Sequence, residues 1–168
     1  MGLVGALVIG KRPGNRMGPV FAGAGLAGMV AATVDDGRGH PLEVLAGTVA
    51  WWNMFFAIVV LVPLLFPTGR VADKRWGLLL WVATISNLIY SMLLLFQSDF
   101  CLEDGVGECL VSLQNPIGIS WIENLEYTIL GDALSSLILL CGVGSLIALG
   151  VRFRRAQRVE RLQIKWLL

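Results

Sequence analysis

The stretch Val44–Phe66, with the sequence VLAGTVAWWNMFFAIVVLVPLLF, contains no charged residue. An α-helix of about 20 residues is long enough to cross the roughly 30 Å hydrocarbon core of a bilayer. Two further apolar runs of similar length follow, Gly77–Phe96 and Ile129–Val151. The sequence therefore predicts three long transmembrane helices, at 44–66, 77–96 and 129–151.

Two shorter apolar runs precede these segments. Pro19–Val34 is rich in glycine, and we expect it to form a fourth span at about 19–34. Met1–Gly10 would reach only about 15 Å as a helix, so we expect a short N-terminal helix at 1–10 that does not cross alone. The predicted fold is an all-α integral membrane protein, with a bundle of four full spans over 1–151 and a basic cytoplasmic helix at 152–168.

The composition favours a membrane environment and excludes several other classes of protein. Hydrophobic residues make up 56% of the 168-residue chain and charged residues 15%, whereas a soluble domain has about 25% charged residues. The net charge of +1 provides no basic field that would recruit nucleic acid. With one histidine and three cysteines in the chain, we expect no metal, no cofactor and no enzymatic activity. The lipid bilayer is the expected partner.

Basic residues occupy alternate connections between the predicted spans. Twelve of the thirteen lie before the 19–34 run, between the 44–66 and 77–96 runs, or after Val151. The other connections contain Arg38 and most of the acidic residues. Lysine and arginine are enriched in the cytoplasmic loops of membrane proteins. We therefore expect the basic connections and the C-terminus in the cytoplasm, and the acidic loops 35–43 and 97–128 outside.

Small residues cluster in the 19–34 run, at Gly23, Ala24, Ala27 and Gly28. Residues 23–28 match the G-x-G-x-x-G pattern of dinucleotide-binding folds, but that pattern works only where a strand delivers the glycines to a helix N-terminus. No such strand is expected here. Small residues four positions apart instead allow transmembrane helices to pack closely. We predict a helix-packing face at these four residues and reject a nucleotide site.

The expected outer loop contains two cysteines, Cys101 and Cys109, separated by a segment with two glycines. An extracytoplasmic compartment permits disulfides, so we predict a bond between them, with two free thiols as the alternative. Glu103, Asp104 and Glu108 lie in the same segment. They lack the pattern of a calcium loop, and we interpret them as a solvated acidic loop.

Polar residues recur at helical spacing in two of the predicted spans. They are Thr84, Asn87 and Ser91 in one, and Asn124, Thr128, Asp132 and Ser136 at the start of the other. A carboxylate within a span usually faces the bundle interior, and antiparallel chain directions place Ser91 and Asp132 at similar depth. We predict a polar seam between these two helices. It would serve either as interhelical hydrogen bonds or as a ligand- or proton-sensing site.

The last span is followed by six basic residues. They are Arg152, Arg154, Arg155, Arg158, Arg161 and Lys165. Such a segment can lie on anionic lipid, pack on a partner or act as a stop signal during insertion, and we predict a cytoplasmic basic anchor. The short first run and the uncapped apolar end at Trp166–Leu168 lead us to expect that the chain is part of a longer protein.

Four short patterns lie along the chain in a defined order. They are the basic turn Lys11–Asn15 (KRPGN), Leu65–Trp76 with LFPTGR and KRW, Asn115–Gly118 (NPIG), and Arg152–Trp166 with RFRRA and VERLQIKW. Together they resemble the membrane-embedded input region of bacterial sensor histidine kinases. That family has R-P-x-N, L-F-P-T-G-R, N-P-hydrophobic-G and R-F-R-R-A segments at these places.

The resemblance implies a sensory and anchoring module of a two-component signalling protein in the bacterial inner membrane. It would act with a protein partner or as a homodimer. A histidine kinase also needs a phosphoacceptor histidine and an ATP-binding domain, whereas the one histidine here, His40, lies in an expected outer loop. The chain would therefore supply input without catalysis. The alternative is an accessory subunit of a larger membrane complex, and a small transporter or channel comes after that.

Overall fold

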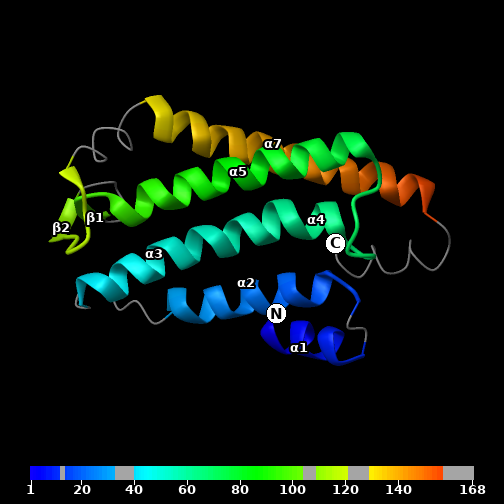
Figure 1. Cartoon of the computed structure of the whole chain (residues 1–168), viewed down its shortest axis with the longest axis horizontal. Helices are drawn as coiled ribbons and strands as arrows, with labels where there is room; N and C mark the ends of the chain where they lie inside the picture. Colours follow the sequence, from blue (N-terminus) through cyan, green and yellow to red (C-terminus); the bar gives the residue numbers. More distant parts are fainter. Residues whose placement is uncertain (12–13, 33–39, 104–108, 121–128, 157–168) are drawn as a thin grey trace.

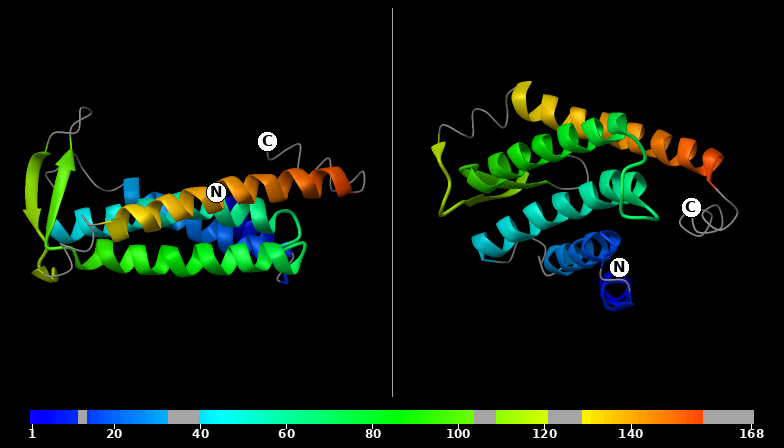
Figure 2. Two further views of the ribbon diagram at one scale, coloured as in Figure 1. Left: turned by 90° about the horizontal axis from the view of Figure 1, so that it is seen from above. Right: turned by 45° about the vertical axis from the view of Figure 1, so that its right-hand side comes forward.

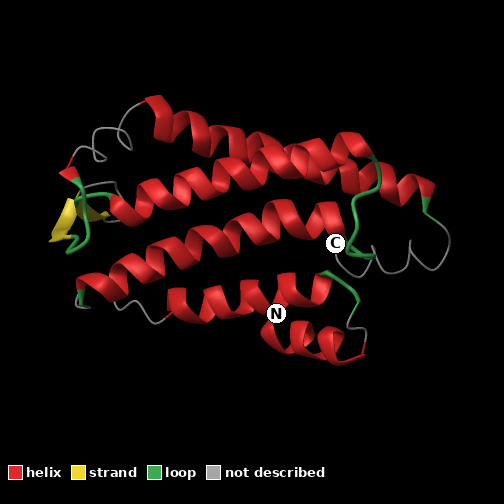
Figure 3. Ribbon diagram, viewed as in Figure 1, coloured by secondary structure: helices red, strands yellow, loops and turns green. Residues whose placement is uncertain are grey.

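The computed structural model describes residues 1–11, 14–32, 40–103, 109–120 and 129–156. Helices dominate the described chain, with one small hairpin at one end (Figures 1 and 3). The elements are α1 (Gly2–Lys11), α2 (Met17–Ala32), α3 (Pro41–Phe56), a π-helical turn η1 (Ala57–Leu61), α4 (Val62–Leu65), α5 (Lys74–Phe96), β1 (Asp99–Glu103), β2 (Cys109–Gln114) and α7 (Ile129–Arg155).

The long helices lie side by side along the molecule. In Figure 1 they follow one another across the view in the order α7, α5, α3 with α4, α2 and α1. The main core lies between the α3–α4 rod, α5 and α7, where Phe56, Val60, Ala83 and Ile138 are buried together. A second cluster joins α2 to α4 through Phe21 and Val62. The helix α1 packs against α2 at the edge of the bundle (Figure 2).

Within the part of the chain that the structure describes, three helices are long and apolar enough to cross a membrane. They cover Pro41–Leu65, Lys74–Phe96 and Ile129–Arg155, with 25, 23 and 27 residues. Large apolar side chains such as Trp81 and Leu140 are about two-thirds exposed, which suits contact with lipid rather than water. These features indicate a multi-pass helical membrane protein. The expected fourth span forms the shorter helix α2, whose 16 residues reach about 24 Å.

A π-helical turn interrupts the 41–65 rod just before Pro63. Proline has no N–H and its ring crowds the carbonyl four residues earlier. Just before it, the Val62 N–H bonds to the Ala57 carbonyl, five residues back. The widened turn brings Val59 against Gly142 of α7, where a Cβ would lie 2.6 Å from Val59 Cγ1. A larger residue at Gly142 would therefore have to displace this contact.

The helix α2 also packs closely against α1. A Cβ on Gly5 would overlap Ala22, and a Cβ on Gly25 would overlap the backbone of Gly2. Small residues on both helices therefore allow the two backbones to approach. This contact was not predicted from the sequence, because the short first helix had no expected packing partner.

The predicted packing face of α2 is partly confirmed. Ala24 is buried, Ala27 is half-buried, and a Cβ on Gly28 would lie 2.9 Å from Met54 Sδ of α3. Gly23 is exposed, with nothing within 4 Å of a Cβ placed on it. Its inclusion in the packing face is wrong among the described residues, because the contact of this face with α3 lies at Gly28 instead.

The end of the bundle opposite the basic connections carries a small hairpin where a loop was expected. The strands β1 and β2 are antiparallel, with Asp99 opposite Gln114 and an irregularity after Leu102. The histidine of the chain lies at the same end, where it caps α3. His40 Nδ1 accepts the N–H of Leu42 at 3.3 Å, and Glu43 accepts the backbone N–H of His40 at 3.2 Å. This cap gives His40 a structural role.

Candidate functional site

Three connections converge at one end of the bundle. They are the α1–α2 turn, the α4–α5 turn and the end of α7, and hydrogen bonds or ion pairs link them (Figure 1). The described basic residues gathered here are Lys11, Arg16, Arg70, Lys74, Arg75, Arg152, Arg154 and Arg155. We call this region the basic end. The connections that carry the basic residues in the sequence therefore meet at one end of the folded bundle.

Arg152, near the end of α7, holds the α4–α5 turn. Its guanidinium donates to the Phe66 carbonyl at 2.5 Å, to the Arg70 carbonyl at 2.7 Å and to Thr68 Oγ1 at 3.4 Å. Phe66 is the C-cap of α4, where helix carbonyls lack intrahelical partners. A planar guanidinium can satisfy several such acceptors at once. One arginine therefore connects α7 to a turn more than 80 residues away.

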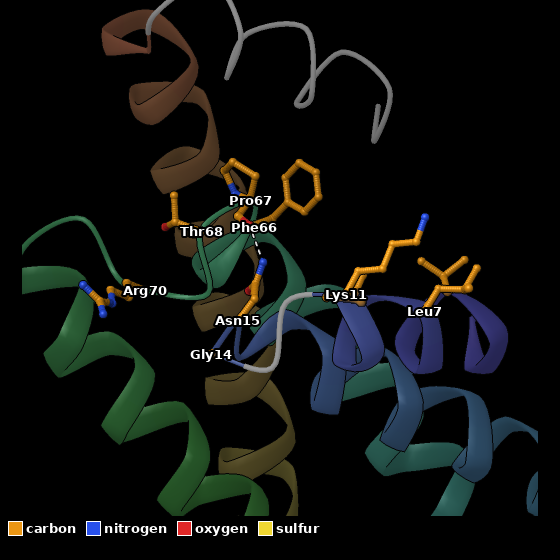
Figure 4. Close-up of a pocket in the computed structure, with 10 residues that line it drawn as sticks. Leu7, Lys11, Gly14, Asn15, Phe66, Pro67, Thr68 and Arg70 are labelled. Atoms are coloured by element: carbon orange, nitrogen blue, oxygen red, sulfur yellow. Dashed lines mark hydrogen bonds between the residues drawn. The ribbon is translucent and has the colours of Figure 1, made fainter.

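Asn15 joins the α1–α2 turn to the same loop. Its Oδ1 accepts the N–H of Met17 at 3.0 Å and so caps α2, while its Nδ2 donates to the Pro67 carbonyl at 3.5 Å (Figure 4). Gly69 faces this residue with a φ of +73°, in the left-handed region that favours glycine. A Cβ on Gly69 would lie 2.7 Å from Asn15 Oδ1. Glycine is therefore required for both the turn and the close approach.

An ion pair adds a weaker link at the basic end. Arg155 lies 3.8 Å from Asp73, the residue before α5, and both side chains are more than half exposed. Exposed pairs of this kind contribute little to stability. Arg152 therefore makes the stronger connection between α7 and the α4–α5 turn.

At the opposite end of the bundle, Asn115 secures the end of α5. Its Nδ2 donates to the Leu95 carbonyl at 2.9 Å and to the Gln97 carbonyl at 2.7 Å, and its Oδ1 accepts the N–H of Ile117 at 3.1 Å. The side chain is buried. The asparagine of the NPIG pattern thus caps a helix that ends about 20 residues earlier. The sequence pattern marked the residue, but only the structure shows what it binds.

A polar seam joins α5 to α3, and not to α7 as predicted. Asn87 Nδ2 donates to Asn53 Oδ1 at 3.0 Å, and Asn53 Nδ2 donates to Ser91 Oγ at 3.1 Å. Asn53 lies at the middle of the 41–65 rod. Thr84, also predicted to lie in the seam, instead bonds to the Leu80 carbonyl of its own helix at 2.7 Å. A polar residue in the centre of an otherwise apolar run was the overlooked signal.

The expected contribution of α7 to this seam is wrong for its described residues. Asp132 and Ser136 are exposed. The buried face of α7 runs through Gly131, Ile138 and Ser145, and at about 100° per residue Asp132 and Ser136 point away from it. Near the start of a helix, a carboxylate is also favoured by the helix dipole. Asn124 and Thr128 lie outside the described residues.

A double-mutant cycle tests the seam. Replacing Asn53 and Asn87 by alanine, singly and together, is expected to give a coupling free energy of about 0.6 kcal/mol, the average for polar pairs between transmembrane helices, and at most about 1.7 kcal/mol. Reversible unfolding in bicelles measures it. The matched control combines Asn53→Ala with Thr84→Ala, whose coupling should be close to zero because Thr84 bonds to its own helix. Equal coupling in both cycles would contradict the observed pairing.

The predicted disulfide and acidic loop fall on the hairpin and its connection. The strand register places Cys101 opposite Ser112 and Cys109 opposite Glu103, so the two cysteines are not at register positions that face each other. The disulfide remains a prediction. Asp104 and Glu108 lie outside the described residues. Among residues that are described, no cluster of three histidine, cysteine or acidic side chains is suited to a metal ion.

The basic anchor is described only in part. Arg152 is half-buried at the turn described above, whereas Arg154 and Arg155 are exposed. Arg158, Arg161 and Lys165 lie outside the described residues.

Comparisons with known protein families, curated proteins and solved structures find no match to this chain. The function is therefore proposed from the sequence resemblance and the geometry of the chain itself.

Proposed function

We propose that this chain is the membrane sensory and anchoring module of a two-component-type signalling protein. It has no catalytic activity of its own in this proposal. Its task is to transmit a change in helix packing to the segment that follows α7. Transmission of this kind requires two packings that differ by a few kcal/mol and that a stimulus favours unequally.

The observation that carries the proposal is the set of hydrogen bonds that Arg152 donates to the α4–α5 turn. Arg152 lies three residues before the end of α7, and the chain continues beyond this helix into its basic tail. The carbonyls that bind it belong to the turn between two other long helices. A displacement of α4 or α5 would therefore move or break the hydrogen bonds that hold the end of α7.

The proposal includes an orientation in the membrane. In it, α2 thins the bilayer locally and crosses as the fourth span, and the basic end faces the cytoplasm of a bacterial cell. The retention of lysine and arginine on that side supports this orientation. The gathering of eight described basic residues at one end of the bundle supports it as well.

A fusion protein tests the proposal. A histidine-kinase output domain is joined after Leu168 of the full chain, and its phosphorylation is measured in intact cells, where ATP is available only on the cytoplasmic side. Arg152→Met should change phosphorylation roughly fivefold or more, the usual scale of coupling between sites. Lys74→Met, an exposed basic residue at the same end, should leave it unchanged.

Equal phosphorylation in the wild type and both variants would overturn the transmitting role. Purification at a fixed ratio with another membrane protein, together with such a result, would instead favour an accessory subunit of a larger complex.

A further inference from the structure

A groove of about 780 Å³ opens at the basic end, between α1 and the α4–α5 turn. Figure 4 shows Leu7 and Lys11 of α1 along one side of it, with Phe66, Pro67 and Thr68 along the other. Val4 and Val8 extend the α1 side, and Gly14, Asn15 and Arg70 complete the lining. The proposed signalling function uses the α4–α5 turn that forms one side of this groove, but it assigns no ligand to the groove.

The groove has an apolar part and a basic part. Leu7 is 63% exposed and Val4 is 51% exposed, so their side chains present an uncovered apolar wall. Lys11, one turn beyond Leu7, is the last residue of α1. The apolar wall therefore ends at a positive charge. A phospholipid has the matching order, with an apolar acyl chain followed by a negatively charged phosphate.

The two uncharged polar side chains of the lining, Asn15 and Thr68, already have partners. Asn15 bonds to Met17 and Pro67 through its two polar atoms, and Thr68 Oγ1 accepts from Arg152. The Lys11 side chain is exposed. Within the described residues it forms no ion pair, and Arg155–Asp73 is the salt bridge found there. Lys11 and Arg70 are thus the two cations of the lining, and Lys11 is the one that lies beside the apolar wall of α1 (Figure 4).

We propose that this groove binds an anionic phospholipid of the cytoplasmic leaflet. The Lys11 ammonium pairs with the lipid phosphate, and an acyl chain covers Val4, Leu7 and Val8. Basic pockets between transmembrane helices on the cytoplasmic side are suited to such headgroups. The inference rests on the orientation given in the proposed function, but it needs no signalling output.

A lipid fits the groove better than a soluble anion does. A free phosphate would meet Lys11 but would leave the apolar wall of α1 uncovered. A zwitterionic lipid would cover the wall, but its own cation would compete with Lys11 for the phosphate. Only an anionic lipid satisfies both parts of the groove.

Native mass spectrometry of the purified full chain tests the site, with phosphatidylglycerol and phosphatidylcholine of identical acyl chains as probes. Phosphatidylglycerol should be retained more strongly. Lys11→Gln should weaken its retention roughly fivefold, as expected for one basic residue at a lipid surface. The matched control Lys74→Gln, an exposed lysine outside the groove, should leave retention unchanged.

A second pair of variants tests the apolar wall. Leu7→Ser should reduce retention roughly threefold or more, whereas Leu3→Ser should have no effect, since Leu3 is 84% exposed on the same helix but does not line the groove. Both positions are exposed, so circular dichroism should show an unchanged helix content.

Three results would overturn the proposal. Equal retention of both lipids would show that charge plays no part, and equal losses with Lys11→Gln and Lys74→Gln would show diffuse surface charge. Displacement of phosphatidylglycerol by millimolar inorganic phosphate would show a soluble-anion site. The kinase fusion is a separate measurement. Selective lipid retention with a silent fusion would therefore refute the signalling role and leave the lipid site standing.

Discussion

Replacing Arg152 by methionine is expected to lower the free energy of unfolding by about 2–3 kcal/mol. Methionine preserves much of the side-chain length but donates no hydrogen bond, so the carbonyls of Phe66 and Arg70 lose their charged donor. Hydrogen bonds to charged groups contribute about 1.5–3 kcal/mol each. Partial exposure of Arg152 to solvent reduces that contribution.

Two further variants separate the charge of Arg152 from its geometry. Arg152→Lys keeps the charge but cannot reach three acceptors with a planar group, so it should recover less than half of the loss. Arg155→Met removes only the exposed pair with Asp73 and should cost less than about 0.5 kcal/mol. Unfolding in bicelles and hydrogen exchange at 66–70 measure these effects. Equal losses for Arg152→Met and Arg155→Met would contradict the role of Arg152.

The long helices could be predicted from the sequence because apolar length alone selects them. Each predicted boundary of 44–66, 77–96 and 129–151 lies within four residues of the observed boundary, in the rods Pro41–Leu65, Lys74–Phe96 and Ile129–Arg155. The basic end was predictable for a related reason. In an antiparallel bundle, every second connection lies at the same end. Basic residues that occupy every second connection in the sequence therefore gather at one end of the structure.

Helix partners were less predictable than helix positions. Periodicity assigns Asn87 and Ser91 to one face of α5, but it does not say which helix that face meets. The neighbour is α3, through Asn53, because α7 presents the small residues Gly142 and Ser145 to the core instead. Asp132 was misassigned because a carboxylate near the start of a span can lie at the bundle surface rather than inside it.

The loop patterns were recognisable in sequence, but their roles were not. Asn15, Gly69 and Arg152 are far apart along the chain, and no local propensity links them. Their contacts form only when the three connections meet at one end of the bundle. The hairpin of β1 and β2 was also missed, because its short strands lie in a segment that we expected to be one long loop.

Asn115→Ala is expected to lower the free energy of unfolding by about 3 kcal/mol. The carbonyls of Leu95 and Gln97, at the end of α5, would lose the amide that donates to both of them. Buried acceptors left without a donor cost about 1–3 kcal/mol each. The turn is also closely packed, because a Cβ on Gly118 would lie 2.7 Å from Ser98 Cα. The NPIG segment therefore has little freedom to relax around the lost amide.

Asn115→Asp makes the prediction specific to the donated hydrogen bonds. The carboxylate can still accept the N–H of Ile117, but its second oxygen would face two carbonyl oxygens and repel them. The aspartate variant should therefore be at least as destabilised as the alanine variant at neutral pH, although aspartate is nearly isosteric with asparagine. Gln114→Ala, at the exposed neighbouring position, is the control and should change stability by less than about 0.5 kcal/mol. Unfolding in bicelles, with limited proteolysis of 97–120, distinguishes these outcomes. Wild-type stability of the Asn115→Asp variant would contradict this prediction. It would show that the hydrogen bond accepted from Ile117, and not the two donated to the end of α5, stabilises this end of the bundle.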